Sequence, residues 1–439
     1  MTATPLEVLS TSIDERTAKI GVIGLGYVGL PLAVELSAAG FEVIGFDIDA
    51  EKVRSIEQGI SYIGDVSSEA LQSVRVADRF TATTDFDQLH EVKVVNVCVP
   101  TPLTRTKDPD VSFMASAVEE IRDRLHPGAL IILGSTTYPG TTRELFVPVL
   151  EETGLKVGRD FSLAFAPERI DPANSKFKVK NVPKVVGGET PLCTELACKL
   201  FDTVFETTVP VSSTQAAEMV KLLENTFRAI NIGLANEVAL MCERLGLDVW
   251  EVIDAAGTKP YGFMKFLPGP GLGGHCIPVD PSYLSWRMKS LNFSARFIEL
   301  ATEINGGMPA HVVERVSDLL NEAELAVNGA SILILGVAYK RDIGDMRESP
   351  AIDVITLLAR KGAKISYHDP FVAECEIDGK RYKGSDLTDD LLAENDLVLI
   401  LTDHGAVDYA HVAEVAARVF DTRNATRGLG DQGGKIVKL

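Results

Sequence analysis

The stretch KIGVIGLGYVGLPLA (residues 19–33) decides the fold of this chain. An apolar run over Ile20–Ile23 leads directly into GLGYVG (residues 24–29), and a helical pattern follows. A second apolar run, Glu42–Phe46, ends just before Asp47, 18 residues beyond Gly29. Two strands around a G-x-G-x-x-G turn, with an acid about 20 residues later, are typical of a βαβ unit that binds a dinucleotide.

Each part of this motif has a physical reason. Gly24 permits a tight turn, Gly26 lets a pyrophosphate approach the backbone, and Gly29 allows close packing of helix on strand. The N-terminus of the helix attracts phosphate charge. Asp47 is placed to accept ribose hydroxyls and would repel a 2′-phosphate, so the motif predicts NAD rather than NADP. A purely structural glycine turn is the alternative, and the flanking strands and the acid count against it.

Changes of pattern along the chain predict three domains. Short apolar strands alternate with helices to about residue 210, as in a parallel sheet buried on both faces. Residues 214–245 contain no proline and carry apolar residues at helix spacing, which predicts one long helix that spans domains or carries a subunit interface. Two shorter helices are expected over residues 295–304 and 310–323. Near Ala330 a second α/β pattern begins, and SILILGVAYK (331–340) resembles residues 19–28 but keeps only Gly336 of the three glycines.

The predicted fold class is therefore α/β, with two Rossmann-like doubly wound domains joined by a central helical domain that contains one long helix. We expect a flexible leader over residues 1–18, an NAD-binding domain over 19–212, a central domain over 213–326 and a C-terminal domain over 327–439. The leader is polar and lacks the pattern of a signal peptide.

The overall composition excludes some classes of binding partner and indicates the cellular compartment. A net charge of −19 argues against nucleic acid or an anionic membrane as a partner. No apolar run approaches the ~20 residues that a membrane span needs. The six scattered cysteines lack disulfide or metal-ligand spacing, so we expect a reducing, cytoplasmic location and no metal site.

The loop PGPGLGGHCIPVDP (residues 268–281) is too rich in proline and glycine for a helix or a strand. Its glycines permit close approach to a ligand, and the thiol of Cys276 could attack a bound carbonyl carbon. The alternative is that Cys276 is a small buried hydrophobe. His275 could tune the thiol, hold substrate or form a structural hydrogen bond, and Asp280 could act as a base, position a water or cap the next helix. The remaining cysteines are expected to be small buried hydrophobes: Cys98, Cys193, Cys198, Cys242 and Cys375.

The long helix carries a polar stripe of Glu218, Lys221, Asn225 and Arg228. A solvated face is the alternative interpretation of such a stripe. Because the helix follows the dinucleotide domain, Lys221 with Asn225 one turn later could hold a sugar oxygen and stabilise a developing alkoxide.

After residue 18 the chain resembles the nucleotide-sugar 6-dehydrogenase family, the UDP-glucose/GDP-mannose dehydrogenases. The resemblance rests on motifs that occur in order: GLGYVGLPLA at 24–33, VPTP at 99–102, Ser135-Thr136 before Pro139-Gly140, APER at 166–169, Lys221 with Asn225, GGHC at 273–276, and AYK at 338–340 followed by DMRESP at 345–350. It implies a central dimerisation region, a homodimer or higher homo-oligomer, and a C-terminal domain that binds the UDP part of a substrate.

Residue roles follow from this resemblance. It implies Cys276 as the nucleophile, Asp280 as a water-activating or proton-handling group, and Glu168 in acid/base steps. Further implied catalytic residues are Lys221 and Asn225 as oxyanion holders and Thr136 as the residue that positions a water. The implied cofactor contacts are Gly24, Gly26, Tyr27, Val28, Gly29, Asp47, Thr101 and Arg347. The implied substrate contacts are Glu168, Arg169, Lys221, Asn225, Gly273, His275 and Lys340.

The implied reaction is a two-step, four-electron oxidation of a C6 alcohol. A hydride leaves to NAD, the Cys276 thiolate adds to the resulting aldehyde as a thiohemiacetal, a second hydride leaves to a second NAD, and water hydrolyses the thioester. Val279 stands where the UDP-glucose branch usually has a basic residue, and residues 259–286 resemble the branch that acts on UDP-N-acetylhexosamines. UDP-N-acetylglucosamine is the expected substrate, with UDP-N-acetylmannosamine and UDP-glucose as alternatives and surface polysaccharide precursors as the expected use.

Two other classes of protein share part of this pattern. One-step β-hydroxyacid dehydrogenases also combine a dinucleotide domain with a Lys-x3-Asn helix, but they use no cysteine and have no C-terminal α/β domain. An NAD-binding regulatory protein without turnover would not need the residues at 275–280. The cysteine loop and residues 330–439 therefore favour the nucleotide-sugar dehydrogenase.

Overall fold

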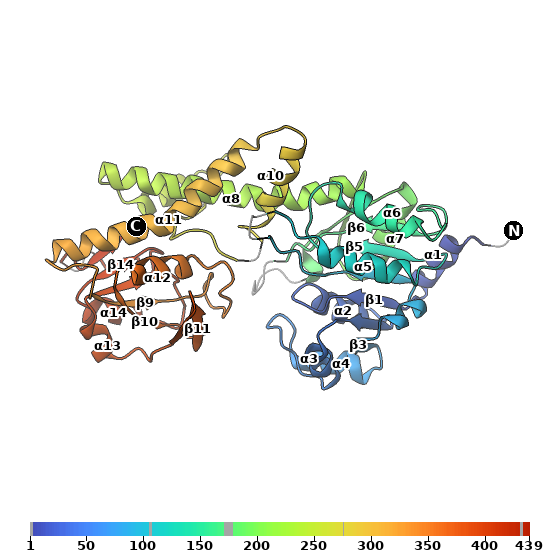
Figure 1. Ribbon diagram of the computed structural model, residues 1–439, viewed down its shortest axis with the longest axis horizontal. Coiled ribbons are helices and arrows are strands. Elements are labelled where there is room, and N and C mark those ends of the chain that lie inside the picture. Colours follow the sequence, from blue (N-terminus) through green and yellow to red (C-terminus); the bar gives the residue numbers. More distant parts are fainter. Residues whose placement is uncertain (1–2, 105–107, 171–178, 275, 431–432) are drawn as a thin grey trace. The chain divides into compact units, whose positions relative to one another are not determined.

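The computed structural model describes residues 3–104, 108–170, 179–274, 276–430 and 433–439. The chain divides into two compact units (Figure 1). The first comprises residues 1–224 and 282–292, and the second comprises residues 225–281 and 293–439.

The first unit is built on a sheet with the order β3-β2-β1-β4-β5-β6-β7-β8. Its strands, within the described residues, are β1 Ile20–Ile23, β2 Val43–Phe46, β3 Phe80–Thr83, β4 Val94–Val97, β5 Leu130–Leu133, β6 Ser162–Phe165, β7 Lys184–Gly188 and β8 Thr208–Val211. The pairing is parallel except between β6 and β7, which run antiparallel. The central strands are buried along their whole length, which explains why their sequence shows no polar alternation.

Helices cover both faces of this sheet. One core packs α1 Pro5–Asp14, α2 Gly29–Ala38, α4 Ser68–Val76 and α7 Pro191–Phe201 against one face. A second core packs the 3-10 helix η1 Phe86–Glu91, α5 Ser112–Arg122 and α6 Val147–Glu151 against the other. The short helix α3 Ala50–Glu57 follows β2 and lies beside β3. Two layers of helices around a mostly parallel sheet make this a doubly wound α/β unit.

The expected flexible leader over residues 1–18 is wrong for most of its length. Helix α1 begins after Thr4, whose side chain and that of Glu7 form a reciprocal capping box. Leu6, Leu9 and Ile13 are buried in the first core. Their spacing of three and four residues gives the helix one apolar face, and burial of that face against α7 orders a segment that looked polar overall.

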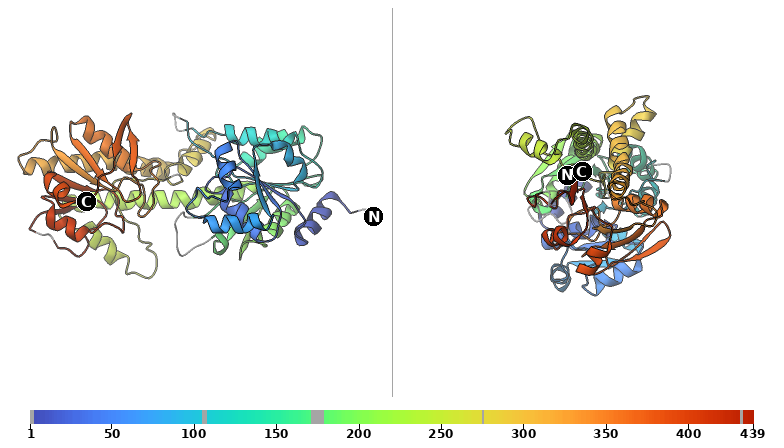
Figure 2. Two further views of the ribbon diagram at one scale, coloured as in Figure 1. Left: turned by 90° about the horizontal axis from the view of Figure 1, so that it is seen from below. Right: turned by 90° about the vertical axis from the view of Figure 1, so that its left-hand side faces the viewer.

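The second unit ends in a smaller parallel sheet with the order β10-β9-β13-β14-β15. Within the described residues its strands are β9 Ser331–Leu335, β10 Lys364–His368, β13 Leu397–Ile400, β14 Val419–Asp421 and β15 Ile436–Lys438. A hairpin of β11 Glu374–Ile377 and β12 Lys380–Lys383 forms a separate two-stranded sheet that packs against β10 and α12. Helix α12 Pro350–Arg360 packs on one face, and α13 Asp389–Glu394 and α14 Tyr409–Val415 pack on the other. The strands of both sheets can be followed in Figure 2.

The helices of the central region are α8 Thr214–Leu245, α9 Val249–Ala256, α10 Asp280–Ser290 and α11 Arg296–Glu322. Residues 295–323, expected as two helices, form the single helix α11 with Pro309 inside it. Tertiary contacts override this local helix breaker. The side chain of Asn305 donates to the carbonyl oxygen of Ala229 at 3.0 Å and accepts from Asn236 at 2.8 Å, which ties α11 to α8 beside the proline.

Helix α8 buries its polar stripe instead of its apolar one. Glu218, Lys221 and Asn225 are buried, and only Arg228 of the predicted stripe is exposed. The side chains of Phe227, Leu234 and Met241, seven residues apart on one face, are 44%, 55% and 49% exposed. No helix in the described parts of the chain has the length and apolar character needed to cross a membrane.

Candidate active site

The glycine turn lies where the chain leaves neighbouring strands β1 and β4 of the first sheet in opposite directions, the place where open α/β sheets bind ligands. Gly24 has a φ of +89°, and a Cβ there would lie 2.6 Å from the carbonyl oxygen of Cys98. A Cβ at Gly29 would lie 1.8 Å from the carbonyl oxygen of Gly24. A Cβ at Gly26 would meet no atom within 4 Å. The first and third glycines are thus needed by the fold, whereas the second opens onto space for a ligand.

The surroundings of the turn fit a dinucleotide. Helix α2 starts at Gly29, and no side chain among the described residues caps its N-terminus. The N-terminal end of a helix attracts phosphate charge. The buried carboxylate of Asp47, at the end of β2, accepts the Leu25 N–H at 2.9 Å and pairs with Lys52 at 3.3 Å. Tyr27 is exposed beside this turn, and Thr101 is buried after β4. The donor-rich turn with an acid at its side has the chemistry that pyrophosphate and ribose require.

The loop after β5, which carries Thr136, is fastened to the start of α8. The fully buried carboxylate of Glu218 accepts the Gly140 N–H at 2.5 Å and both the N–H and the hydroxyl of Thr142 at 2.8 and 2.6 Å. Burial raises the pKa of Glu218 in spite of these hydrogen bonds. Thr136 is half-buried in this loop. Glu218, predicted as part of a polar stripe, therefore serves to hold the loop that carries Thr136.

Glu168 forms a buried ion pair with Lys184, the first residue of β7. The ammonium lies 3.2 Å from Glu168 Oε2, and the two side chains are 4% and 12% exposed. The N–H groups of Arg169 and Ile170 donate to Glu168 Oε1 at 2.7 and 2.9 Å. Burial alone would raise the pKa of Glu168, but Lys184 and these hydrogen bonds outweigh it and hold the pKa below its usual range. Glu168 is therefore an ionised carboxylate at neutral pH.

Arg169, a predicted substrate contact, is held by protein groups in the first unit. Its guanidinium donates to both carboxylate oxygens of Glu224, at 3.1 and 2.5 Å, and to the carbonyl oxygen of Pro183 at 2.5 Å. The side chain is thereby fixed in one orientation.

Lys221 and Asn225 lie one turn apart on α8 and are 8% and 6% exposed. Lys221 forms no ion pair with any residue that the structure describes. The Asn225 amide donates to Asp280 Oδ2 at 2.5 Å, and Asp280 is 2% exposed. An amide N has two N–H groups, so one remains to face a ligand oxygen. The structure brings Asn225 and Asp280 together, 55 residues apart in the chain.

Cys276 is half-buried, and its carbonyl oxygen accepts the N–H groups of Val279 and Asp280 at 3.1 and 2.8 Å. These bonds place it in the turn that leads into α10. The N-terminal ends of helices stabilise negative charge, which suits a thiolate. His275 lies outside the described residues. Cys98, Cys193 and Cys242 are buried as predicted, whereas Cys198 and Cys375 are only half-buried. Burial raises the pKa of the Cys98 thiol to about 12.

The cysteine loop packs on the segment that follows β9. A Cβ at Gly273 would lie 2.7 Å from Tyr339 Cβ and 2.9 Å from the carbonyl oxygen of Glu348. The Gly274 N–H donates to the carbonyl oxygen of Arg347 at 3.1 Å. The guanidinium of Arg347 is paired with Asp345 through both Nε and an Nη atom. Gly273 is thus required by packing within the second unit, and Lys340 is half-buried in the same segment.

Three charged residues near these groups were missed by the sequence analysis. Lys184 pairs with Glu168, Lys52 pairs with Asp47, and Arg423 follows β14 at the carboxyl edge of the second sheet. Arg423 Nε donates to the carbonyl oxygen of Leu401 at 2.9 Å, and a Cβ at Gly269 would lie 2.7 Å from one of its Nη atoms. Of the three, only Lys184 could have been found from the sequence, because a lysine that begins a buried apolar strand needs a partner of opposite charge.

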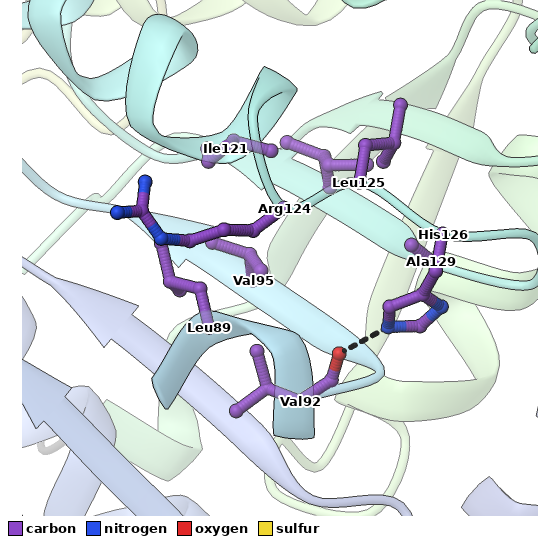
Figure 3. Close-up of a pocket in the computed structure, with 9 residues that line it drawn as sticks. Leu89, Val92, Val95, Ile121, Arg124, Leu125, His126 and Ala129 are labelled. Carbon is purple, nitrogen blue, oxygen red and sulfur yellow. Dashed lines mark hydrogen bonds between the residues drawn. The ribbon is translucent and has the colours of Figure 1, made fainter. Parts of the chain in front are cut away.

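A small apolar cavity in the first unit lies away from these groups (Figure 3). It is lined by Val92, Ala129 and their neighbours, at the amino-terminal ends of β4 and β5, and His126 Nε2 lies 2.8 Å from the carbonyl oxygen of Val92. Because ligands of open α/β sheets bind at the opposite, carboxyl edge, the cavity has no place in the site.

Comparison with known proteins covers most of the chain. Residues 18–206, 215–306 and 333–428 match the NAD binding, central and UDP binding domains of the UDP-glucose/GDP-mannose dehydrogenase family. The UDP-N-acetyl-D-glucosamine 6-dehydrogenase of Pseudomonas aeruginosa is 38% identical over 82% of this chain and 84% of its own. A UDP-N-acetyl-D-mannosamine dehydrogenase of Methanococcus maripaludis is 35% identical over 96% of both chains.

A solved structure supports the same relationship. The UDP-D-ManNAc dehydrogenase from Pyrococcus horikoshii superposes with a TM-score of 0.86 at 32% identity, over 93% of this chain and 96% of that one. A dinucleotide turn and the two parallel sheets define an NAD-dependent oxidoreductase of two Rossmann-like domains. The chain belongs to the UDP-glucose/GDP-mannose dehydrogenase family and is a nucleotide-sugar 6-dehydrogenase.

Proposed function

We propose that this chain oxidises the C6 hydroxyl of UDP-N-acetylglucosamine to the carboxylate, through a thioester on Cys276. The observation that carries the proposal is the group formed by Cys276, Asp280 and Asn225, in which a thiol precedes a buried carboxylate that is hydrogen-bonded to a buried amide. The 38% identity to a UDP-N-acetyl-D-glucosamine 6-dehydrogenase supports this sugar. UDP-N-acetylmannosamine is the second candidate, because dehydrogenases for that sugar reach 35%.

The overall reaction converts R–CH₂OH, one water and two NAD⁺ into R–COO⁻, two NADH and three protons. NAD, when bound, accepts one hydride from C6 in each half-reaction. The ammonium of Lys221 and the second N–H of Asn225 stabilise negative charge on the C6 oxygen. After the first oxidation the Cys276 thiolate forms a C–S bond to the aldehyde carbon, and loss of the second hydride converts this adduct to a thioester.

Hydrolysis of the thioester completes the sequence. Asp280 takes a proton from the attacking water, the C–S bond breaks, and Cys276 leaves as a thiolate ready for another turnover. The hydroxyl of Thr136 positions that water, and the Glu168 carboxylate accepts protons. Because its pKa is held low, Glu168 is ionised at neutral pH and is in the form that can take up a proton.

The remaining predicted contacts divide between the cofactor and the substrate. We assign Gly24, Gly26, Tyr27, Val28, Gly29, Asp47 and Thr101 to NAD, with Arg347 as a further cofactor contact. Arg169, Gly273 and Lys340 are assigned to the UDP-sugar. We propose domain boundaries of 19–212, 213–326 and 327–439. We also propose a cytoplasmic location, because all six cysteines are free thiols, as is usual in a reducing compartment.

Product stoichiometry tests the proposed reaction. With UDP-N-acetylglucosamine, UDP-N-acetylmannosamine and UDP-glucose as separate substrates, we expect two NADH for each UDP-N-acetylglucosamine consumed and the highest kcat/KM for that sugar. The measurement combines absorbance of NADH with chromatography of the nucleotide sugar. A ratio of one NADH would contradict the thioester route, and a higher kcat/KM for UDP-N-acetylmannosamine would shift the substrate to the epimer.

Asp47 has two roles that substitution should reveal. Asp47→Ala removes the acceptor for ribose hydroxyls and the anchor of the Leu25 N–H. We expect the KM for NAD to rise about tenfold or more, since a hydrogen bond to a charged group contributes about 1.5–3 kcal/mol. The KM for the UDP-sugar should stay within about twofold. Initial rates with varied NAD measure this, and an unchanged KM for NAD would remove the ribose role.

We also propose that the exposed apolar face of α8 is covered by a second copy of this chain. Phe227, Leu234 and Met241 form a stripe along one helix face, whose exposure to water is unfavourable. Leu234→Glu should convert a dimer to a monomer, observed by analytical ultracentrifugation. Glu195→Gln, at an exposed position on α7, serves as the control that leaves the dimer intact. A wild-type protein that sediments as a monomer would contradict the proposal.

A further inference from the structure

A buried histidine lies at the carboxyl edge of the second sheet. His404 follows β13 and is fully buried. Its Nδ1 accepts the backbone N–H of Asp342 at 3.0 Å, and its Nε2 lies 3.0 Å from Asp369 Oδ2. Because Nδ1 is an acceptor, the proton of the neutral ring belongs on Nε2, which donates to Asp369. The ring thus connects two loops that follow neighbouring strands.

Asp369, which follows β10, stands in the second sheet where Asp47 stands in the first. Asp47 accepts the N–H after the glycine turn of β1, and Asp369 accepts the N–H groups of Val337 and Ala338, after Gly336, at 2.8 and 3.1 Å. The remaining partners differ. Asp47 pairs with Lys52, which is 37% exposed, whereas Asp369 is enclosed by His404. Asp47 could therefore face a ribose, whereas Asp369, its counterpart in the second sheet, is already bonded to His404.

The segment after β9 forms an arch that is fastened at both ends. Val337 and Ala338 are tied to Asp369 at its start, and Asp342 is tied to His404 at its end. Asp342 has a φ of +60°, a conformation that residues other than glycine rarely adopt without support. Its side chain accepts the Gly405 N–H at 2.6 Å, on the same loop as His404. Between the two ends lie residues 339–341.

The arch lies where β9 and β13 are neighbours and the chain leaves them in opposite directions, the position at which parallel sheets of this kind bind ligands. Lys340 at its centre supplies a positive charge that suits a diphosphate. The orientation of this lysine depends on the backbone of the arch, and only His404 links the far end of the arch to Asp369 by a side chain in the described residues.

We propose that His404 is a positioning residue of the UDP site, which holds the arch 339–341 in its binding conformation through the bond between Nδ1 and the Asp342 N–H. The proposal rests on the proposed function in that residues 333–428 bind the UDP part of the substrate. This role requires a hydrogen-bond acceptor at the position of Nδ1, whereas the donor at Nε2 is secondary.

Two substitutions separate these two ring nitrogens. In His404→Asn the side-chain oxygen can occupy the place of Nδ1, and in His404→Gln the side-chain amide N can occupy the place of Nε2. Titration calorimetry of the full chain with UDP should give a Kd within about threefold of wild type for the Asn variant. The Gln variant leaves the Asp342 N–H without its acceptor, and its Kd for UDP should rise about tenfold. The Kd for NAD should stay within about twofold in both.

A matched control is His411→Gln, whose ring lies on α14 at the surface and pairs with Asp389. Thermal unfolding checks that each variant is folded. If the Asn and Gln variants bound UDP with equally weakened affinity, or if the Gln variant kept wild-type affinity, the positioning role would be overturned. The proposed function would be unaffected by either result. A wild-type chain that does not bind UDP would instead overturn the proposed function, and this proposal with it.

Discussion

Replacing Cys276 with alanine is expected to lower the rate of acid formation by at least about 10³-fold, because removal of a covalent nucleophile leaves only binding and charge stabilisation. Cys276 lies in the turn before α10 and is followed by the buried Asp280. Without the thiol the aldehyde cannot form the thiohemiacetal from which the second hydride leaves. The measurement is the yield of uronic acid by chromatography alongside NADH by absorbance.

Cys198→Ala provides the matched control for this substitution. Cys198 lies half-buried on α7, and burial raises the pKa of its thiol, so it remains protonated near neutral pH. The control should keep nearly full activity. Binding of NAD and UDP to the Cys276→Ala protein should stay close to wild type. Acid formation by Cys276→Ala within tenfold of wild type would exclude a thioester on this residue.

The second large effect is expected for Lys184→Met. This substitution leaves the Glu168 carboxylate buried without its cation, and such a change costs about 3–5 kcal/mol of stability. The ammonium also lies 5.4 and 5.2 Å from the ring centres of Phe201 and Phe205, so the loss extends to the core beside α7. Thermal unfolding should show a lower Tm, by about 2–4 °C for each kcal/mol. Activity at pH 7 should fall about 100-fold, as for loss of a general base.

The pH dependence of this variant has a definite sign. In the wild type the folded pKa of Glu168 lies below its unfolded value, so the stability that it contributes is present above about pH 4.3 and is lost as the pH falls through the folded pKa. In Lys184→Met, burial dominates and raises the folded pKa, so the variant becomes less stable as the pH rises above the unfolded value. The difference in Tm between the two proteins should therefore grow from pH 4 to pH 7.

Lys180→Met is the control for the loss of a lysine. Lys180 pairs with Glu35 at the surface at 3.1 Å, and both side chains are partly exposed. Its removal should change the Tm by little, since exposed ion pairs contribute about 0–1 kcal/mol. If Lys184→Met matched this control in Tm at pH 7, Lys184 would not compensate the charge of Glu168.

Much of the fold could be predicted from local pattern. The long helix was expected over 214–245 and spans Thr214–Leu245, because a proline-free run with helix spacing needs no tertiary information. The strands β1 and β2 were evident as short apolar runs. By contrast, α11 was expected as two helices, because the glycines and Pro309 that interrupt the pattern are overridden by its packing on α8. Helix α1 was missed because its three buried apolar residues stand among polar ones.

The sequence by itself determined the motifs whose chemistry is local. The glycine turn with Asp47, the loop that holds Cys276, and the order of two α/β patterns around a helical region are all evident in short segments, because backbone conformation and hydrophobic periodicity act over a few residues. Tertiary structure alone decided which charges meet. Glu168 with Lys184, Asn225 with Asp280, and His404 with Asp342 and Asp369 are pairs distant in sequence. Folding brings them together, and burial makes their pairing obligatory, since an isolated charge or polar group in the interior is too costly to retain.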